Sequence, residues 1–84
     1  MVDKSINKAS LGKYRVIGYD QYDYNEYFIK EYSNVYQALF LVWRKSRKSN
    51  ATPTSFSDIY FIYNDKGEML YKGTFDEGIK KQTN

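Results

Sequence analysis

The sequence predicts an α+β fold, in which an antiparallel sheet of about four strands carries one helix packed on one face. The expected order is strand, strand, helix, strand, strand, within a single domain that spans residues 1–84. Two observations predict this order. Runs rich in Tyr, Ile, Val and Phe alternate with the period of strands at 13–19, 26–32, 58–64 and 68–74. A longer run at 35–48 has the apolar spacing of an amphipathic helix.

The small size of the domain limits its stability. A chain of this length buries only about 60% of the surface that its unfolded state exposes. The sequence has no cysteine, so it forms neither a disulfide nor a thiolate metal site. Large aromatic side chains or a second subunit must therefore supply stability, and a homo-oligomer is part of the hypothesis.

The first two strands are expected to form a hairpin. The run 13–19 alternates Tyr14 and Val16 with Ile17, and the run 26–32 places Phe28 on the face opposite to its neighbours. The residues between them, 20–25, carry Asp and Asn side chains that favour turns, but no glycine. We expect a turn of more than two residues, with Tyr22 and Tyr24 at its exposed tip.

The helix is expected to begin after Ser33 and Asn34, which are both good N-cap residues. On a helical wheel, the side facing the sheet consists of Val35, Leu39, Val42, Trp43 and Ser46, with Tyr36 at its margin. The opposite side and flank consist of Gln37, Phe40, Leu41, Arg44, Arg47 and Lys48. Packing against one sheet does not explain Phe40 and Leu41, which are therefore candidate contacts for a partner.

The second half of the chain predicts a loop and a second hairpin. Residues 49–57 contain the only proline and form the loop, and 58–64 has apolar residues on both faces, as in a central strand. Asp65, Lys66 and Gly67 form the hairpin turn, in which Gly67 adopts the left-handed conformation. Residues 1–12 are expected to be flexible and 76–84 to form a frayed tail.

One helix covers only one face of a sheet, so the other face is expected to form an exposed platform. The aromatic residues assigned to that platform are Phe28, Tyr60 and Tyr19. A second copy or another partner would have to cover them.

Composition argues against most enzymatic chemistry. The chain has no histidine and no cysteine, and its glycines at 12, 18, 67, 73 and 78 fit no phosphate-binding loop. The acidic turn residues Asp20, Asp23, Asn25 and Glu26 could supply oxygens to a cation, but their spacing is not that of a calcium loop, and a solvated turn explains them. We therefore predict a protein that is not an enzyme, with no cofactor and no metal.

The main hypothesis is a small module that binds a protein through a tyrosine-rich surface. The ten tyrosines of the chain combine large contact area with a polar group, as binding hot spots require. Tyr14, Tyr27 and Tyr63 are assigned to packing, and the candidate contacts are Tyr22, Tyr24, Tyr60, Phe40 and Leu41. The size and the missing catalytic residues suit an inhibitor or adaptor of the kind that phages and plasmids encode.

Two alternatives use the basic end of the helix. Arg44, Lys45, Arg47 and Lys48 supply four positive charges in five residues, although the chain as a whole carries only +3. They could bind nucleic acid without regard to sequence, or a small anion together with the loop 49–57.

We expect a soluble cytoplasmic protein without a membrane segment. The first residues are polar and lack the apolar core of a secretion signal. The longest apolar run, 38–43, is much shorter than the ~20 residues that cross a bilayer.

Overall fold

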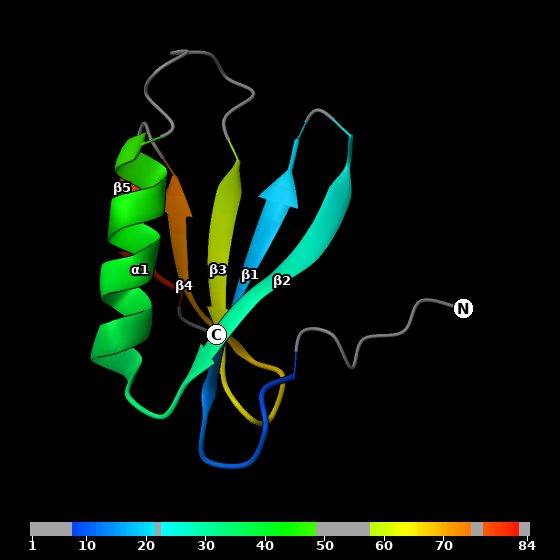
Figure 1. The fold of residues 1–84 in the computed structure, drawn as a ribbon, viewed down its shortest axis with the longest axis vertical. Coiled ribbons are helices and arrows are strands. Elements are labelled where there is room, and N and C mark those ends of the chain that lie inside the picture. Colours follow the sequence, from blue (N-terminus) through cyan, green and yellow to red (C-terminus); the bar gives the residue numbers. More distant parts are fainter. Residues whose placement is uncertain (1–7, 22, 49–57, 75–76, 83–84) are drawn as a thin grey trace.

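The computed structural model describes residues 8–21, 23–48, 58–74 and 77–82. Within these residues the chain forms one α-helix and one five-stranded antiparallel sheet (Figure 1). The elements are β1 (Tyr14–Asp20), β2 (Asn25–Tyr32), α1 (Val35–Lys48), β3 (Ile59–Tyr63), β4 (Met69–Thr74) and β5 (Gly78–Lys81). The predicted α+β class is therefore confirmed, and α1 has the predicted bounds.

The strand order in the sheet is β2-β1-β3-β4-β5. Both β2 and β3 pair antiparallel with β1, so they run in the same direction on either side of it. The connection between them is α1, which crosses one face of the sheet (Figure 1). Because the connection returns the chain to the middle of the sheet, β3 becomes the central strand, as the sequence predicts.

The fifth strand corrects the predicted strand count. Gly78–Lys81 pairs with β4 as an edge strand, in a segment for which the sequence predicted a frayed tail. Gly78 has φ +72°, a left-handed conformation that glycine adopts without cost and that starts the strand. The sequence of β5 did not predict a strand, because it contains glycine and two lysines. Edge strands often carry lysine in place of the usual strand residues.

Residues 8–12 also differ from the expected flexible segment. The Ala9 N–H donates to the Asn64 carbonyl at 3.0 Å, and the Ala9 side chain is buried. The Gly12 N–H donates to an Asp65 carboxylate oxygen at 2.8 Å. These bonds attach the segment to the turn between β3 and β4, where Gly67 has the predicted left-handed conformation (φ +80°).

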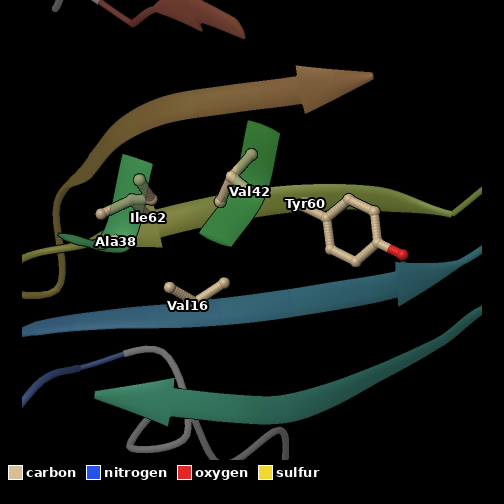
Figure 2. Packing of buried hydrophobic residues seen from close by; sticks show 5 residues of the cluster. All are labelled: Val16, Ala38, Val42, Tyr60 and Ile62. Carbon is tan, nitrogen blue, oxygen red and sulfur yellow. The ribbon is translucent and has the colours of Figure 1, made fainter. Parts of the chain in front are cut away.

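The core lies between α1 and one face of the sheet, which we call the helix face. Val16 from β1 and Ile62 from β3 pack against Ala38 and Val42 of α1, and Tyr60 lies further along β3 (Figure 2). Residues paired across neighbouring strands share a face, so the partners of Tyr60 and Ile62 in β4 also point towards α1. The partner of Tyr60 is Gly73, which has no side chain to separate the sheet from the helix.

This glycine sets how the helix is rotated. A Cβ atom on Gly73 would lie 2.4 Å from Cγ1 of Val42, far closer than atoms can pack. The innermost helix residues are accordingly small or short: Ala38, Val42 and Ser46. Trp43 is too large for this gap and points outwards, so the predicted sheet-facing side is wrong for Trp43 and Tyr36.

On the opposite face of the sheet, which we call the second face, large side chains of neighbouring strands cover one another. Ile17 lies in one row with Phe28 of β2 and Phe61 of β3, and it is fully buried. Tyr63 is also buried there, and burial, followed by the negative charge of Glu26, raises the pKa of its hydroxyl. Of the predicted platform residues, Phe28 is half exposed, whereas Tyr60 lies on the helix face.

Candidate functional site

The outward side of α1 is the most exposed aromatic surface in the described part of the chain. Tyr36, Phe40 and Trp43 are 75%, 58% and 49% exposed. Their spacing of four and three residues places them along one side of the helix. Side chains of this size are usually covered in a monomer, and here they lie together on the face that points away from the sheet.

Two arginines complete this surface. The rings of Phe40 and Trp43 are stacked, with centroids 6.1 Å apart and planes inclined by 21°. The guanidinium of Arg44 lies 5.8 Å from the Phe40 centroid, and that of Arg47 lies 5.3 Å from the Trp43 centroid. We call Tyr36, Phe40, Trp43, Arg44 and Arg47 the outer surface of α1.

Local interactions explain why the helix presents these residues. Asn34 caps the helix as predicted, because its side-chain oxygen accepts the Tyr36 N–H at 2.8 Å. On the inner side, the buried Ser46 hydroxyl donates to the Trp43 carbonyl at 3.1 Å, so its polar group is satisfied within the helix. The small inner residues then allow close packing on the sheet, which turns the larger residues towards solvent.

The stacked arginines remain able to bind an acidic group. A guanidinium that lies over a ring uses its face for that contact, whereas its five N–H donors lie in its plane. The sequence of α1 contains four basic residues and no acidic residue. The electrostatic potential along α1 is therefore positive, and its own side chains supply no counter-ion.

A group of acidic residues lies around the turn between β1 and β2. Asp20 and Asp23 flank that turn, and Asp23 donates its N–H to a carboxylate oxygen of Asp20 at 3.3 Å. Figure 1 shows this turn at the same end of the molecule as the C-terminal end of α1, across the width of the sheet. Among the described residues, no three His, Cys, Asp or Glu side chains are close enough to hold a metal ion.

The structure separates the predicted contact residues. Phe40 lies on the outer surface of α1, whereas Leu41 packs against the core and is partly buried. Tyr24 is 80% exposed at the hairpin tip, and Tyr22 lies outside the described residues. Tyr60 is only 7% exposed and belongs to the core, so it leaves the candidate set.

The tyrosines assigned to packing do pack. Tyr14 contacts the core cluster, and Tyr27 lies over Gly18, where an added Cβ would be 2.3 Å from its ring. The Tyr27 hydroxyl donates to an Asp58 carboxylate oxygen. Burial, and then this bond to Asp58, raise the pKa of Tyr27 well above its ordinary value.

The four basic residues of the nucleic-acid alternative do not form one surface. Arg44 and Arg47 are exposed on the outer surface, whereas Lys45 is partly buried on the side towards the sheet. The Lys48 side chain and the loop 49–57 of the anion alternative lie outside the described residues. Two of the four charges therefore accompany the exposed aromatic rings.

The helical wheel missed Tyr36 and Trp43. The signal that finds them is the spacing of Tyr36, Phe40, Trp43 and Arg47, which is continuous along one side of the helix. The helical wheel placed Trp43 on the side facing the sheet together with Val42 and Ser46, and it assigned Ala38 to neither side. A helix often approaches its sheet most closely at a small residue such as alanine that has apolar residues on both sides in the sequence.

The chain has a hollow of about 300 Å³ between residues 12–14 and the turn after β3. Lys13 and Lys66 line it together with Asn64 and Asp65. The polar groups of the last two already bond to the chain: Asp65 accepts from Gly12, and Asn64 accepts from the N–H groups of Lys66 and Glu68. These polar groups hold residues 12–14 and the turn after β3 in place, so the hollow needs no ligand to explain them.

Comparison of the chain with known protein families, curated proteins and solved structures found no match. In the described ranges, no helix has both the length and the apolar character needed to span a membrane. The outer surface of α1 thus has to be interpreted from its own chemistry.

Proposed function

We propose that this protein is a non-catalytic binding module that contacts a protein partner through the outer surface of α1. The supporting observation is the exposed stack of Phe40 and Trp43 with Arg44 and Arg47 over their rings. Trp, Tyr and Arg are the residues most enriched at binding hot spots. Contacts that these side chains already make with one another reduce the conformational entropy that they lose on binding.

Several features favour a protein over a nucleic acid as the partner. A helix that reads a DNA groove presents polar side chains to base edges, whereas the centre of this helix surface is aromatic. Bases of a single strand stack on free ring faces. Here the faces of Phe40 and Trp43 are engaged by each other and by the two arginines, so stacking a base would displace one of them.

The proposal can be tested by affinity capture from a lysate of the source of the protein, with and without nuclease. Three tagged proteins are compared: the wild type, the double variant Phe40→Ala with Trp43→Ala, and the control Tyr24→Ala. Tyr24 and Phe40 are more than half exposed and Trp43 is about half exposed, so each variant should stay folded, with a loss of about 0.5 kcal/mol or less at Tyr24 and Phe40 and a larger loss at Trp43. Circular dichroism at increasing temperature checks that the variants are folded.

We expect a discrete protein that survives nuclease, binds the wild type and the Tyr24 control, and is lost from the double variant. Equal retention by the double variant would show that another surface is used. If only nucleic acid is retained, and nuclease removes it, then the basic end of α1 binds nucleic acid instead.

A further inference from the structure

We infer that the partner presents an acidic, amphipathic helix of about three turns to the outer surface of α1. This inference rests on the proposed function and defines the chemistry of its partner. Apolar side chains of the partner helix contact Phe40 and Trp43, and its carboxylates pair with Arg44 and Arg47. Charge, the backbone of α1 and the dimensions of the surface each support this assignment.

Charge disfavours a second copy of the same surface as the occupant. The outer surface of α1 carries Arg44 and Arg47 and no acidic residue, so two such surfaces packed face to face would combine four arginines and no acidic side chain of either helix. Like charges at close range disfavour such a contact by several kcal/mol. A complementary partner carries acidic residues, so a partner of that kind fits this surface better than a second copy does.

The arginines select carboxylates at a defined spacing. Arg44 and Arg47 are three residues apart and therefore lie on the same side of α1, about one turn from each other. Each guanidinium group lies over an aromatic ring, Arg44 over Phe40 and Arg47 over Trp43. A guanidinium in this position offers two parallel N–H donors to one carboxylate, an arrangement that a flexible lysine does not provide.

The backbone of α1 argues that the partner segment is itself helical. The N–H and C=O groups along a helix are already bonded within it, so α1 offers only side chains to a partner. A segment that loses water against Phe40 and Trp43 must therefore satisfy its own backbone, as a helix does. Addition of a strand to the sheet is less suitable, because β2 pairs irregularly near Lys30 and β5 is a four-residue strand that ends in two lysines.

The dimensions set the length and strength of the contact. The outer surface extends from Tyr36 to Arg47, which at ~1.5 Å per residue is about 16 Å along the axis. A partner helix of about eleven residues covers that distance. Such a contact is smaller than a standard interface of about 1,200–2,000 Å², so we expect a dissociation constant in the micromolar range.

Trp43 makes a direct test possible, because it is the only tryptophan of the chain. Its fluorescence therefore reports on the proposed contact in the unmodified protein. The probe is a synthetic helix-forming peptide without aromatic residues, with Leu along one side and Glu along the other. Three further probes are the same composition in scrambled order, the same peptide with Lys in place of Glu, and oligothymidylate.

We expect the acidic amphipathic peptide to shift Trp43 emission to shorter wavelength and to protect it from acrylamide. The scrambled peptide should bind at least about tenfold more weakly, because its apolar residues no longer form one side. The basic peptide should not bind. The affinity for the acidic peptide should fall as salt increases, because the ion pairs lie at the edge of the contact.

A matched pair of variants tests the role of the arginines. Arg44→Gln with Arg47→Gln removes two charges from the outer surface, whereas Lys66→Gln with Lys80→Gln removes two exposed charges elsewhere. The first variant should bind the acidic peptide about tenfold more weakly than the second, whose net charge is identical. Equal affinities would show that only net charge matters, and would overturn the inference.

Other outcomes overturn it as well. The inference fails if the acidic peptide does not bind, if the scrambled peptide binds equally, or if oligothymidylate gives the stronger Trp43 signal. Failure here leaves the proposed function intact as long as capture of a protein from lysate still depends on Phe40 and Trp43. Loss of that dependence would instead remove the proposed function itself.

Discussion

On the helix face of the sheet the closest contacts involve small residues, whereas on the second face they involve the largest side chains. Gly73 lies directly beneath Val42, and Ala38 is fully buried beside it. On the second face, Ile17 is buried between Phe28 and Phe61 without a helix above it. The two faces therefore exclude water by different means, one by packing short helix side chains directly on the sheet and the other by large side chains.

This difference explains where the exposed aromatic residues are. Close approach on the helix face leaves no space for Trp43 or Phe40 between α1 and the sheet, so both rings point to solvent. On the second face, aromatic side chains cover their neighbours and lose much of their own exposure. Three exposed aromatic residues consequently lie together on the helix, where the sequence predicted only Phe40 as a contact, whereas Tyr60, predicted on the exposed face of the sheet, is buried.

The largest effect is expected from filling the gap beneath α1. Gly73→Val places new atoms at the position where even a Cβ would be 2.4 Å from Val42, so α1 must move away from the sheet. Overpacking of a core costs about 1–3 kcal/mol, and we expect the upper end of that range because the Val42 side chain is fully buried. Urea unfolding followed by circular dichroism measures the loss.

A double-mutant cycle gives the control. In the background Val42→Ala the same substitution should cost at least about 1 kcal/mol less, because the clashing methyl group is absent. If Gly73→Val costs the same in both backgrounds, the contact between Gly73 and Val42 does not set the position of α1.

Most of the fold could be predicted from local sequence signals. Asn34 marked the start of the helix, Gly67 marked the second hairpin, and alternation marked four of the five strands. The fifth strand could not be found in this way, because its residues are glycine, isoleucine and two lysines. Its stability comes from pairing with β4, which no local pattern contains.

The candidate surface was less predictable, because it depends on which face of each element is turned inwards. Both faces of β3 are apolar, so alternation alone could not decide whether Tyr60 or Phe61 points to α1. The same ambiguity affects α1, where Ala38 and Trp43 compete for the inner side. The deciding residue, Gly73, lies on a different strand and is 35 positions from Ala38.

A smaller effect is expected on the second face, where polar bonds hold residues 8–12 against the sheet. Glu31 accepts hydrogen bonds from the backbone N–H of Ser10 at 3.0 Å and from Nε of Arg15 at 2.8 Å. Burial alone would raise the pKa of Glu31, but the bonds from Ser10 and Arg15 outweigh it and lower the pKa below 4.5. Glu31→Gln should cost about 1.5 kcal/mol at neutral pH, since water still reaches part of this group.

The lowered pKa also gives this prediction a pH dependence. The folded state binds the proton of Glu31 more weakly than the unfolded state, so the stabilisation is complete well above pH 4.5 and is lost as pH falls below it. The wild type and Glu31→Gln should therefore converge in stability in acid. A constant difference between neutral pH and about pH 3 would show that the charge of Glu31 is not what holds the second face.

A single hydrogen bond at the end of the helix face should contribute less. Tyr27→Phe removes the hydroxyl that bonds to Asp58 but keeps the ring over Gly18, so we expect a loss of about 1 kcal/mol. Because the pKa of Tyr27 is raised, its stabilisation is complete below its ordinary value of 10.0 and decreases as pH rises above that value. Unfolding measured on both sides of that pH should show the variant losing less stability than the wild type.

The hairpin tip belongs to neither face and should give the smallest effect, with the opposite sign. Tyr24 has φ +54°, a left-handed conformation that costs energy for any residue with a Cβ atom, and its ring is 80% exposed. Tyr24→Gly removes that cost without losing a packed side chain, so we expect a gain of about 0.5 kcal/mol. Tyr24→Ala, which keeps the Cβ, should leave the unfolding free energy unchanged. A loss of stability in Tyr24→Gly would mean that the ring packs against the domain. The hairpin tip would then be stabilised as the second face is, by large side chains that cover their neighbours.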